Sequence, residues 1–486
     1  MTQQAAAVRK QLNHPVVDAD GHWLELFPVF FEFLDETAGP SAVDGFRTLL
    51  KGAGGLARWY GMSDAERLRI RAMRPPAWAF PFKARIRTPS MVPGLYYDSL
   101  DRWGIDVALI YPSMGLMIPG VREDDLRRAL VRAYNRMVAE LFRPYRDRII
   151  PAAICLMHTP EEAMEEADYA VRTLGLKLLM INGTVSRPAM GMPSAEGSSP
   201  AYVDNLAMDS PFDYEPVWDA FERLKVSPTN HAGSVGWADR SSPSSFVANH
   251  LGHFAQGNHS FARALFMGGV TQRHPDLNFG FLEGGVGWAC SLFADLCGHW
   301  SKRSRPFVEE WCRPTLLDLA EVRRQLERYA PRDTRLAGKI EQILAGNIDT
   351  MEPDITLEQL AERDEGFDEF AGLSINGNAD IQRLFCSKFY FGCEADDPAT
   401  AWAFSRPFRG AGIKPVFGSD ISHFDVEDPD EVLGEAWEQV EHGFLSEQDF
   451  KSFTFTNAVK LHGRTNPDFF KGTVVEKQAA VVLAES

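Results

Sequence analysis

Cysteine is sparse in this sequence, and long hydrophobic runs are missing. The 486 residues include six cysteines and no Cys-x-x-Cys pair, so we expect reduced thiols, with neither disulfides nor a zinc ribbon. No stretch approaches the ~18 uncharged apolar residues of a membrane span, and the segment Met1 to Arg9 lacks the apolar part of a signal peptide. These absences predict a cytoplasmic protein without a membrane partner.

Positive charge is also in deficit. The chain has 50 Lys and Arg residues against 67 Asp and Glu residues, which gives a formal net charge of −17 at pH 7. Neutralising phosphates requires clustered Lys and Arg, so this balance argues against nucleic acid as a partner. Neither G-x-G-x-x-G nor G-x-x-x-x-G-K-[ST] occurs, which argues against a doubly wound sheet with a phosphate-binding loop.

Apolar and aromatic residues are abundant instead. Hydrophobic residues make up 45% of the chain, and the aromatic residues include 33 Phe and 11 Trp. Such a composition supports a large core, and the aromatic excess indicates large apolar interfaces or a pocket for an apolar ligand. We therefore expect a small-molecule substrate as the partner and a homo-oligomeric assembly.

Strand-like and helix-like segments alternate along the chain. Repeated alternation predicts a parallel sheet covered by helices, and eight units predict closure into a (β/α)8 TIM barrel of the α/β class. We expect one metal-dependent domain over residues 1–486, with a lid-like first βα connection at 23–100 and a helical insertion at 300–384 between strands six and seven. The expected strands span residues 15–20, 105–111, 149–156, 176–181, 225–230, 277–282, 389–393 and 414–418.

The opening strand leads into the sequence Asp18-Ala19-Asp20-Gly21-His22. Residues two apart share one face of a strand, so the side chains of Asp18, Asp20 and His22 are expected to project together. Carboxylate and imidazole groups are the oxygen and nitrogen donors that suit Zn, Mn or Fe. The alternative for this pattern alone is a turn in which the Asp side chains bind backbone N–H groups.

Three further potential ligands lie at the expected C-terminal ends of other strands, where side chains of a barrel meet. His231 follows strand five, Glu283 follows strand six and Asp420 follows strand eight. With Asp20 and His22 they supply the donor types for one or two divalent ions. We expect His231 and Asp420 to be catalytic as well, with Asp420 as the general base. Each residue could instead serve the fold, but five structural residues at strand ends is the less economical account.

Other residues are expected around this cluster. His250 and His253 share one face of a helix expected at 245–269, so either could complete the shell of a second ion. The first connection is rich in Pro and aromatic residues, and a connection of this length is usually functional. We expect the substrate pocket to be lined by Trp78, Phe80 and His423.

Several of these motifs resemble the amidohydrolase superfamily in its decarboxylase-related branch. The resemblance covers roughly residues 15–465 and is carried by Asp18-x-Asp20-x-His22, Ala133-Tyr134-Asn135, His231, Leu282-Glu283-Gly284-Gly285, Gly418-Ser419-Asp420 and Thr456-Asn457-Ala458. It implies a metal-bearing (β/α)8 barrel with ligands from strands one, five, six and eight. By this resemblance, His22 matches the second histidine of strand one, His231 the strand-five histidine and Asp420 the strand-eight aspartate.

Two positions depart from that family pattern. Asp20 stands where the first histidine of strand one is usual, and Glu283 stands where a strand-six histidine is common. Both changes replace a neutral donor with an anionic oxygen, which favours harder ions or two ions. In this respect the chain also resembles a small subgroup typified by the non-haem di-iron monooxygenase of platensimycin biosynthesis.

Three functions remain open from the sequence. The first is metal-dependent hydrolysis or decarboxylation of a small, largely apolar or aromatic substrate. The second is hydroxylation of an apolar substrate by a di-iron monooxygenase. The third is a non-catalytic binding scaffold, and the five potential ligands at strand ends argue against it.

Overall fold

The computed structural model describes residues 3–51, 56–75, 83–189, 201–231, 240–313, 316–345, 368–424 and 426–485. The chain divides into two compact units, one made of residues 1–292 and 382–486 and the other of residues 293–381. All strands of the described residues belong to the first unit. The second unit overlaps the span 300–384 that the sequence predicts as an insertion.

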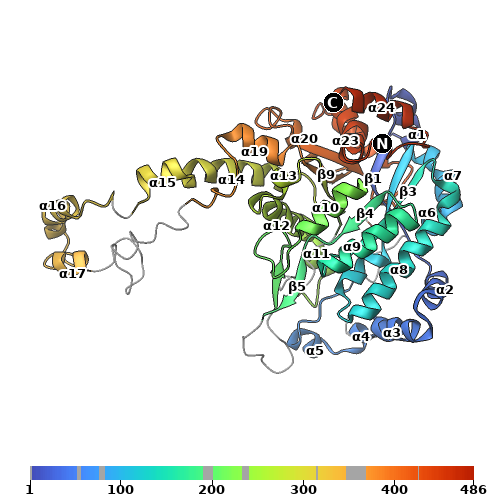
Figure 1. Ribbon diagram of the computed structural model, residues 1–486, viewed down its shortest axis with the longest axis horizontal. Coiled ribbons are helices and arrows are strands. Elements are labelled where there is room, and N and C mark those ends of the chain that lie inside the picture. Colours follow the sequence, from blue (N-terminus) through green and yellow to red (C-terminus); the bar gives the residue numbers. More distant parts are fainter. Residues whose placement is uncertain are drawn as a thin grey trace. The chain divides into compact units, whose positions relative to one another are not determined.

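Eight parallel strands form the centre of the first unit (Figure 1). They pair in the order β1-β2-β3-β4-β7-β8-β9-β10. Backbone hydrogen bonds of 3.0 Å from Asp420 N to Asp20 O and from His22 N to Ile421 O join β1 to the segment after β10. The predicted (β/α)8 barrel is confirmed. The strands are β1 (Val17–Trp23), β2 (Val107–Pro112), β3 (Ile149–Cys155), β4 (Leu178–Ile181), β7 (Pro228–Asn230), β8 (Phe279–Phe281), β9 (Phe389–Glu394) and β10 (Lys414–Gly418).

Each of these strands overlaps one of the eight runs expected from the sequence, although the bounds differ by up to three residues. All residues of β2 and β3 are buried, as are those of β4, β7 and β8. Parallel strands covered on both faces carry near-continuous apolar runs, which is why the sequence pattern located them.

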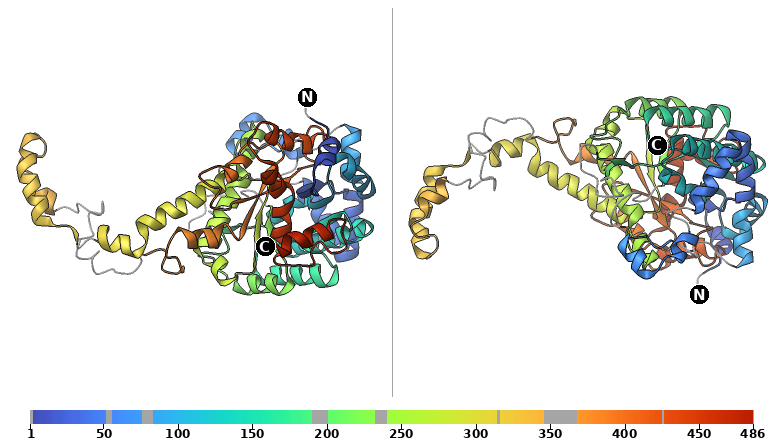
Figure 2. Two further views of the ribbon diagram at one scale, coloured as in Figure 1. Left: turned by 90° about the horizontal axis from the view of Figure 1, so that it is seen from above. Right: turned by 90° about the horizontal axis from the view of Figure 1, so that it is seen from below.

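Helices surround the strands of the first unit (Figure 2). Asn135 joins helix α8 (Asp124–Leu141) to β3 by two hydrogen bonds. Its Nδ2 donates to the carbonyl of Ile154 at 2.9 Å, and its Oδ1 accepts from the N–H of Ile154 at 2.8 Å. The other helices near the strands include α9 (Pro160–Asp168), α10 (Glu215–Leu224), α12 (His253–Met267), α13 (Val270–Arg273), α20 (Thr400–Phe404), α21 (Val432–Glu441), α22 (Glu447–Lys451), α23 (Asn457–Gly463) and α24 (Glu476–Ala484), with α1 (Ala5–Gln11) before β1.

The first βα connection consists mainly of helices. They are α2 (Phe27–Ala38), α3 (Pro40–Lys51), α4 (Leu56–Gly61), α5 (Asp64–Arg69), α6 (Ala84–Met91) and α7 (Pro93–Trp103). A second departure from the simple alternation is an antiparallel hairpin of β5 (Val185–Pro188) and β6 (Ala201–Asp204), which the sequence did not reveal. The lid-like role of residues 23–100 stays a prediction.

The second unit is helical in its described part. Helix α14 (Gly287–Arg303) leads into it and α19 (Asn378–Phe385) leads out of it, with α15 (Arg305–Trp311), α16 (Leu319–Tyr329) and α17 (Ile340–Ala345) between them. No residue of α16 is buried. Among all described residues, none of the helices is long and apolar enough to cross a membrane.

Candidate metal centre

Strand β1 delivers two candidate ligands, Asp20 and His22, and uses Asp18 to close the barrel. A bulge between Asp18 and Gly21 interrupts its pairing with β2 and breaks the expected alternation of side chains. Asp18 accepts hydrogen bonds from the N–H and the hydroxyl of Ser419, at 2.9 and 2.6 Å. A Cβ at Gly21 would lie 2.6 Å from Asp18 Oδ2, so this approach requires glycine. Asp18 thus serves the seam between β1 and β10, whereas Asp20 and His22 belong to the donor cluster.

Glu283 and Asp420 are held in an uncommon backbone conformation just after β8 and β10. Their φ angles of 51° and 48° lie in the left-handed region. This conformation costs a residue with a Cβ of order 1–3 kcal/mol, and such residues concentrate at functional sites. The strain therefore supports a functional role for both carboxyl groups.

The five predicted ligands converge in space. His231 Nε2 lies 3.0 Å from His22 Nε2 and 3.2 Å from Asp20 Oδ1. It also lies 3.5 Å from Glu283 Oε2, and Asp420 Oδ1 lies 3.4 Å from His22 Nε2. Two sets of possible ligand atoms each fall within 4.8 Å of one another: Asp20, His22 and His231 in one, and His22, Glu283, Asp420 and His423 in the other.

His22 presents an unprotonated nitrogen to this cluster. Its Nδ1 lies 3.0 Å from the carbonyl oxygen of Pro112, which can only accept a hydrogen bond, so Nδ1 carries the proton. Burial lowers the pKa of His22, which keeps the ring neutral. The Nε2 lone pair then faces Asp20 Oδ1 at 3.6 Å and Asp420 Oδ1 at 3.4 Å. A cation between these atoms would remove the repulsion, so the residues fit a divalent metal.

Asp20 is kept in its ionised form. Burial by itself would raise the pKa of Asp20, but the interactions with His231 and His22 outweigh it and lower the pKa to about 2. An ionised carboxylate beside neutral imidazoles is the form in which these groups bind metals.

His423 lies beside Asp420, in contact with a residue that the sequence did not single out. Its Nδ1 is 2.7 Å from Asp420 Oδ1, and its ring stacks on that of His22 at 3.9 Å. Its Nε2 lies 3.1 Å from Ser113 Oγ, at the end of β2. Nothing in the local sequence around Ser113 signals this contact. The predicted role of His423 in lining the substrate pocket stays a prediction.

His250 borders the cluster, and His253 lies next to His250. His250 Nε2 is 3.9 Å from Glu283 Oε1, whereas the His253 ring packs against His250 at 5.0 Å and Phe254 at 4.0 Å. Neither histidine belongs to the two donor sets that include His22. Burial lowers the pKa of His253 to about 2. The single helix expected at 245–269 is wrong, because Gly252 with φ 73° separates α11 (Phe246–His250) from α12.

Aromatic side chains border the same cluster. The edge of Phe254 meets the His231 ring at 5.3 Å, and Phe246 and Phe424 flank His250 at 5.1 and 5.6 Å. The position of Phe424 directly after His423 could have indicated it from the sequence. Trp78 and Phe80, predicted to line the pocket, lie outside the described residues.

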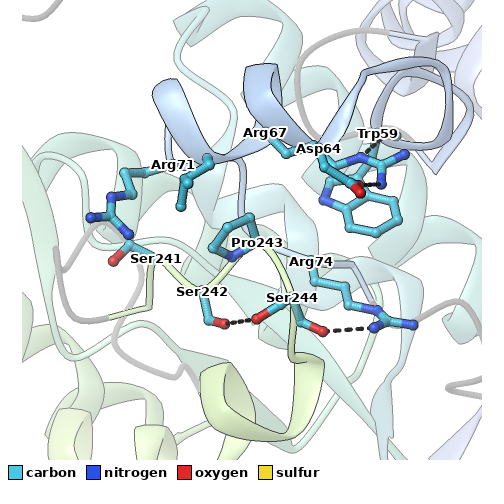
Figure 3. Close-up of a pocket in the computed structure, with 10 residues that line it drawn as sticks. Trp59, Asp64, Arg67, Arg71, Arg74, Ser241, Ser242, Pro243 and Ser244 are labelled. Carbon is cyan, nitrogen blue, oxygen red and sulfur yellow. Dashed lines mark hydrogen bonds and ion pairs between the residues drawn. The ribbon is translucent and has the colours of Figure 1, made fainter.

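A cleft of about 750 Å³ lies between α5 and the segment that precedes α11, and its lining includes none of the five predicted ligands (Figure 3). Arg67 donates to the carbonyls of Trp59 and Tyr60, and Arg74 donates to the carbonyl of Ser244 at 2.6 Å. Arg74 therefore joins the first connection to the segment that leads into α11 and His250, whereas the bonds of Arg67 stay within the first connection.

Comparisons with known proteins agree with this fold. The family model described as amidohydrolase matches residues 17–334, which is more than half of the chain. An amidohydrolase of Mycobacterium avium subsp. paratuberculosis is 17% identical, with a TM-score of 0.53 over 93% of this chain and 100% of that one. A 5-carboxyvanillate decarboxylase of Sphingomonas paucimobilis is 12% identical, with a TM-score of 0.50 over 92% and 98% of the two chains. A search of curated proteins found no match.

Proposed function

Because the chain belongs to the amidohydrolase family, we propose that it is a divalent-metal enzyme that acts on a small aromatic or apolar substrate. Decarboxylation of an aromatic acid is the reaction we favour, and hydrolysis is its alternative within the family. The observation that carries the proposal is the convergence of imidazole and carboxyl groups from the ends of β1, β7, β8 and β10. This end of a barrel is where active sites lie.

His22, His231 and Asp20 would hold one ion, and Glu283 and Asp420 would complete its shell or share a second ion. A mixture of imidazole nitrogens and carboxylate oxygens suits Mn, Fe or Zn. When bound, such an ion polarises a substrate oxygen and lowers the pKa of water.

Asp420 is the residue we assign to proton transfer. Decarboxylation needs a proton at the carbon that loses carbon dioxide, and hydrolysis needs a proton taken from water. The Asp420 side chain is only 5% exposed, and its Oδ1 lies between His22 Nε2 at 3.4 Å and His423 Nδ1 at 2.7 Å. His231 is the second catalytic candidate, because its buried Nε2 faces the same space.

The aromatic border supports an apolar, planar substrate. Phe254 meets His231 edge-on, and Phe246 and Phe424 flank His250. Rings placed beside ligand atoms favour stacking of an aromatic substrate near the metal. The similar decarboxylase of Sphingomonas paucimobilis is named for an aromatic acid, 5-carboxyvanillate, which supports the same substrate class.

Hydroxylation by a di-iron centre is the second candidate. Glu283 favours it, because its Oε2 faces His231 at 3.5 Å while its Oε1 faces His250 at 3.9 Å. A carboxylate with its two oxygens directed at two histidines could serve two ions. Three carboxyl groups in one cluster would also balance the charge of two ions better than that of one.

The deciding experiment combines metal analysis with an activity screen. The protein is purified without added metal, its Mn, Fe and Zn are counted per chain, and hydroxylated benzoic acids are incubated with it under nitrogen. We expect about one tightly bound ion per chain and carbon dioxide release that persists without oxygen. Turnover that requires oxygen, with two irons per chain, would establish the oxygenase instead.

A matched pair of variants connects the activity to the site. Asp420→Asn should abolish turnover while the circular dichroism spectrum stays native. Asp449→Asn is the control, because Asp449 caps α22 and pairs with Arg409 outside the donor cluster. Equal activity in the Asp420 variant and the control would remove Asp420 from the reaction.

A further inference from the structure

A chain of side-chain contacts links β2 to the donor cluster. Ser113 follows β2, and its Oγ lies 3.1 Å from Nε2 of His423. The opposite ring nitrogen, Nδ1, lies 2.7 Å from Asp420 Oδ1. A carboxylate oxygen accepts, so Nδ1 carries the proton and Nε2 accepts from the Ser113 hydroxyl. The order of the contacts is therefore hydroxyl, imidazole and carboxylate.

The backbone of Ser113 is itself fixed by a buried carboxyl group. Glu25 Oε2 accepts from the N–H groups of Ser113 and Met114 at 3.3 and 2.8 Å, and its Oε1 accepts from Gly115 at 2.9 Å. Glu25 is 8% exposed and lies two residues beyond the end of β1. Three hydrogen bonds to one carboxyl group hold the turn after β2 in a single position.

The ring of His423 is restrained on three sides. Ser113 bonds one nitrogen, Asp420 bonds the other, and the His22 ring stacks on its face at 3.9 Å with an interplanar angle of 29°. His423 therefore cannot rotate without breaking a hydrogen bond or the stack. Restraining the ring fixes Asp420 Oδ1, which is bonded to it.

The same geometry could indicate a serine nucleophile, and the surrounding donors argue against it. Acyl transfer needs N–H groups directed at the oxyanion that forms next to the serine. The three N–H groups of the turn, from Ser113, Met114 and Gly115, all donate to Glu25. The Ser113 hydroxyl is therefore left with one role, which is to orient the His423 ring.

We infer that Ser113, anchored by Glu25, is a positioning residue that orients His423 and thereby Asp420 for metal binding. This inference rests on the proposed metal centre and adds an outer layer to it. Partners that orient metal-binding side chains typically contribute 10- to 100-fold to metal affinity or activity. We expect the Ser113 hydroxyl to contribute a similar factor to metal affinity, although it contacts neither substrate nor metal.

The test is the affinity of the full-length, chelator-treated protein for Mn²⁺, measured by calorimetry and by the Mn²⁺ electron paramagnetic resonance spectrum. Ser113→Ala should bind about 10- to 100-fold more weakly and broaden the spectrum, and Ser113→Thr, which keeps the hydroxyl, should stay within about threefold of wild type. The control is Ser99→Ala, because the Ser99 hydroxyl donates to Leu95 O within α7, away from the donor cluster. Ser113→Val matches the shape of Thr without its hydroxyl and should reproduce the loss, which gives an answer if Ser113→Ala does not fold.

The outcomes separate this inference from the proposed function. A wild-type protein that binds no divalent metal would overturn both. Wild-type affinity and spectrum in Ser113→Ala, or in Ser113→Val if only that variant folds, would overturn the positioning role alone. Covalent labelling of Ser113 by a fluorophosphonate would overturn it as well, because it would show an activated nucleophile, whereas we expect no labelling.

Discussion

Glu283→Gln should weaken metal binding while it preserves the shape of the site. The Glu283 side chain is 5% exposed, and its oxygens lie 3.5 Å from His231 Nε2 and 3.9 Å from His250 Nε2. Gln fills the same volume but removes one negative charge next to the metal position. We expect the metal dissociation constant to rise by about 100-fold, which corresponds to about 2.8 kcal/mol.

The loss has a measurable effect on stability. A ligand that binds only the folded state stabilises it by RT ln(1 + [L]/Kd), so 1 mM Mn²⁺ with a Kd of about 1 µM contributes about 4.1 kcal/mol. A 100-fold weaker Kd leaves about 1.4 kcal/mol. Without metal the Glu283→Gln variant should be more stable than wild type, because ligand oxygens of Glu283 and Asp420 lie within 4.8 Å of each other and repel when both are ionised. At an effective dielectric constant of about 20, two unit charges about 4.8 Å apart repel by about 3.5 kcal/mol, and removing that repulsion stabilises the metal-free variant.

Urea unfolding with 1 mM MnCl2 and with a chelator measures both effects. A Glu283→Gln protein that keeps the full metal-induced stabilisation would refute the role of Glu283 as a ligand. Glu283→His distinguishes the two candidate functions. In a single-ion site it restores the family's usual donor and should keep metal and some activity, whereas a di-iron site should lose one ion and all oxygen-dependent turnover.

Three further predictions concern other parts of the chain. Replacing residues 304–377 by a flexible linker should leave metal stoichiometry unchanged, because the insertion supplies none of the five predicted ligands; metal analysis of the shortened protein checks this. Asn135→Leu should lower the unfolding free energy by about 3 kcal/mol in urea without changing metal content, because it leaves the backbone groups of Ile154 unbonded. Burial lowers the pKa of Lys414 to about 7, so the unfolded state binds more protons between pH 7 and 10.5 and stability should rise with pH there. Lys414→Met should stabilise the protein at pH 7 by about 4 kcal/mol and remove that slope, and urea titrations at pH 7 and 9.5 measure the difference.

The sequence by itself determined the barrel and the identity of the candidate ligands. Buried parallel strands carry continuous apolar runs, so each of the eight strands was visible locally. Asp20, His22, His231, Glu283 and Asp420 were identifiable because they follow those runs, and the C-terminal ends of barrel strands meet at one place. Both inferences need only local pattern and the geometry of the fold class.

Only the tertiary structure decided which neighbouring residues support those ligands. Asp18 has the same local signal as Asp20, but the bulge in β1 and the contact with Ser419 assign it to the seam. The break at Gly252, which separates His250 from the helix that begins at His253, depends on one residue in the left-handed conformation.

The contact between Ser113 and His423 joins residues 310 positions apart. A local sequence pattern cannot predict this contact, because the two residues come together only when β2 and β10 have joined the closed barrel. The same holds for the left-handed φ angles of Glu283 and Asp420, which residues with a Cβ keep only where the surrounding structure holds them. The sequence therefore determined which groups are candidates for a metal site, and packing over long sequence distances decided how they are held.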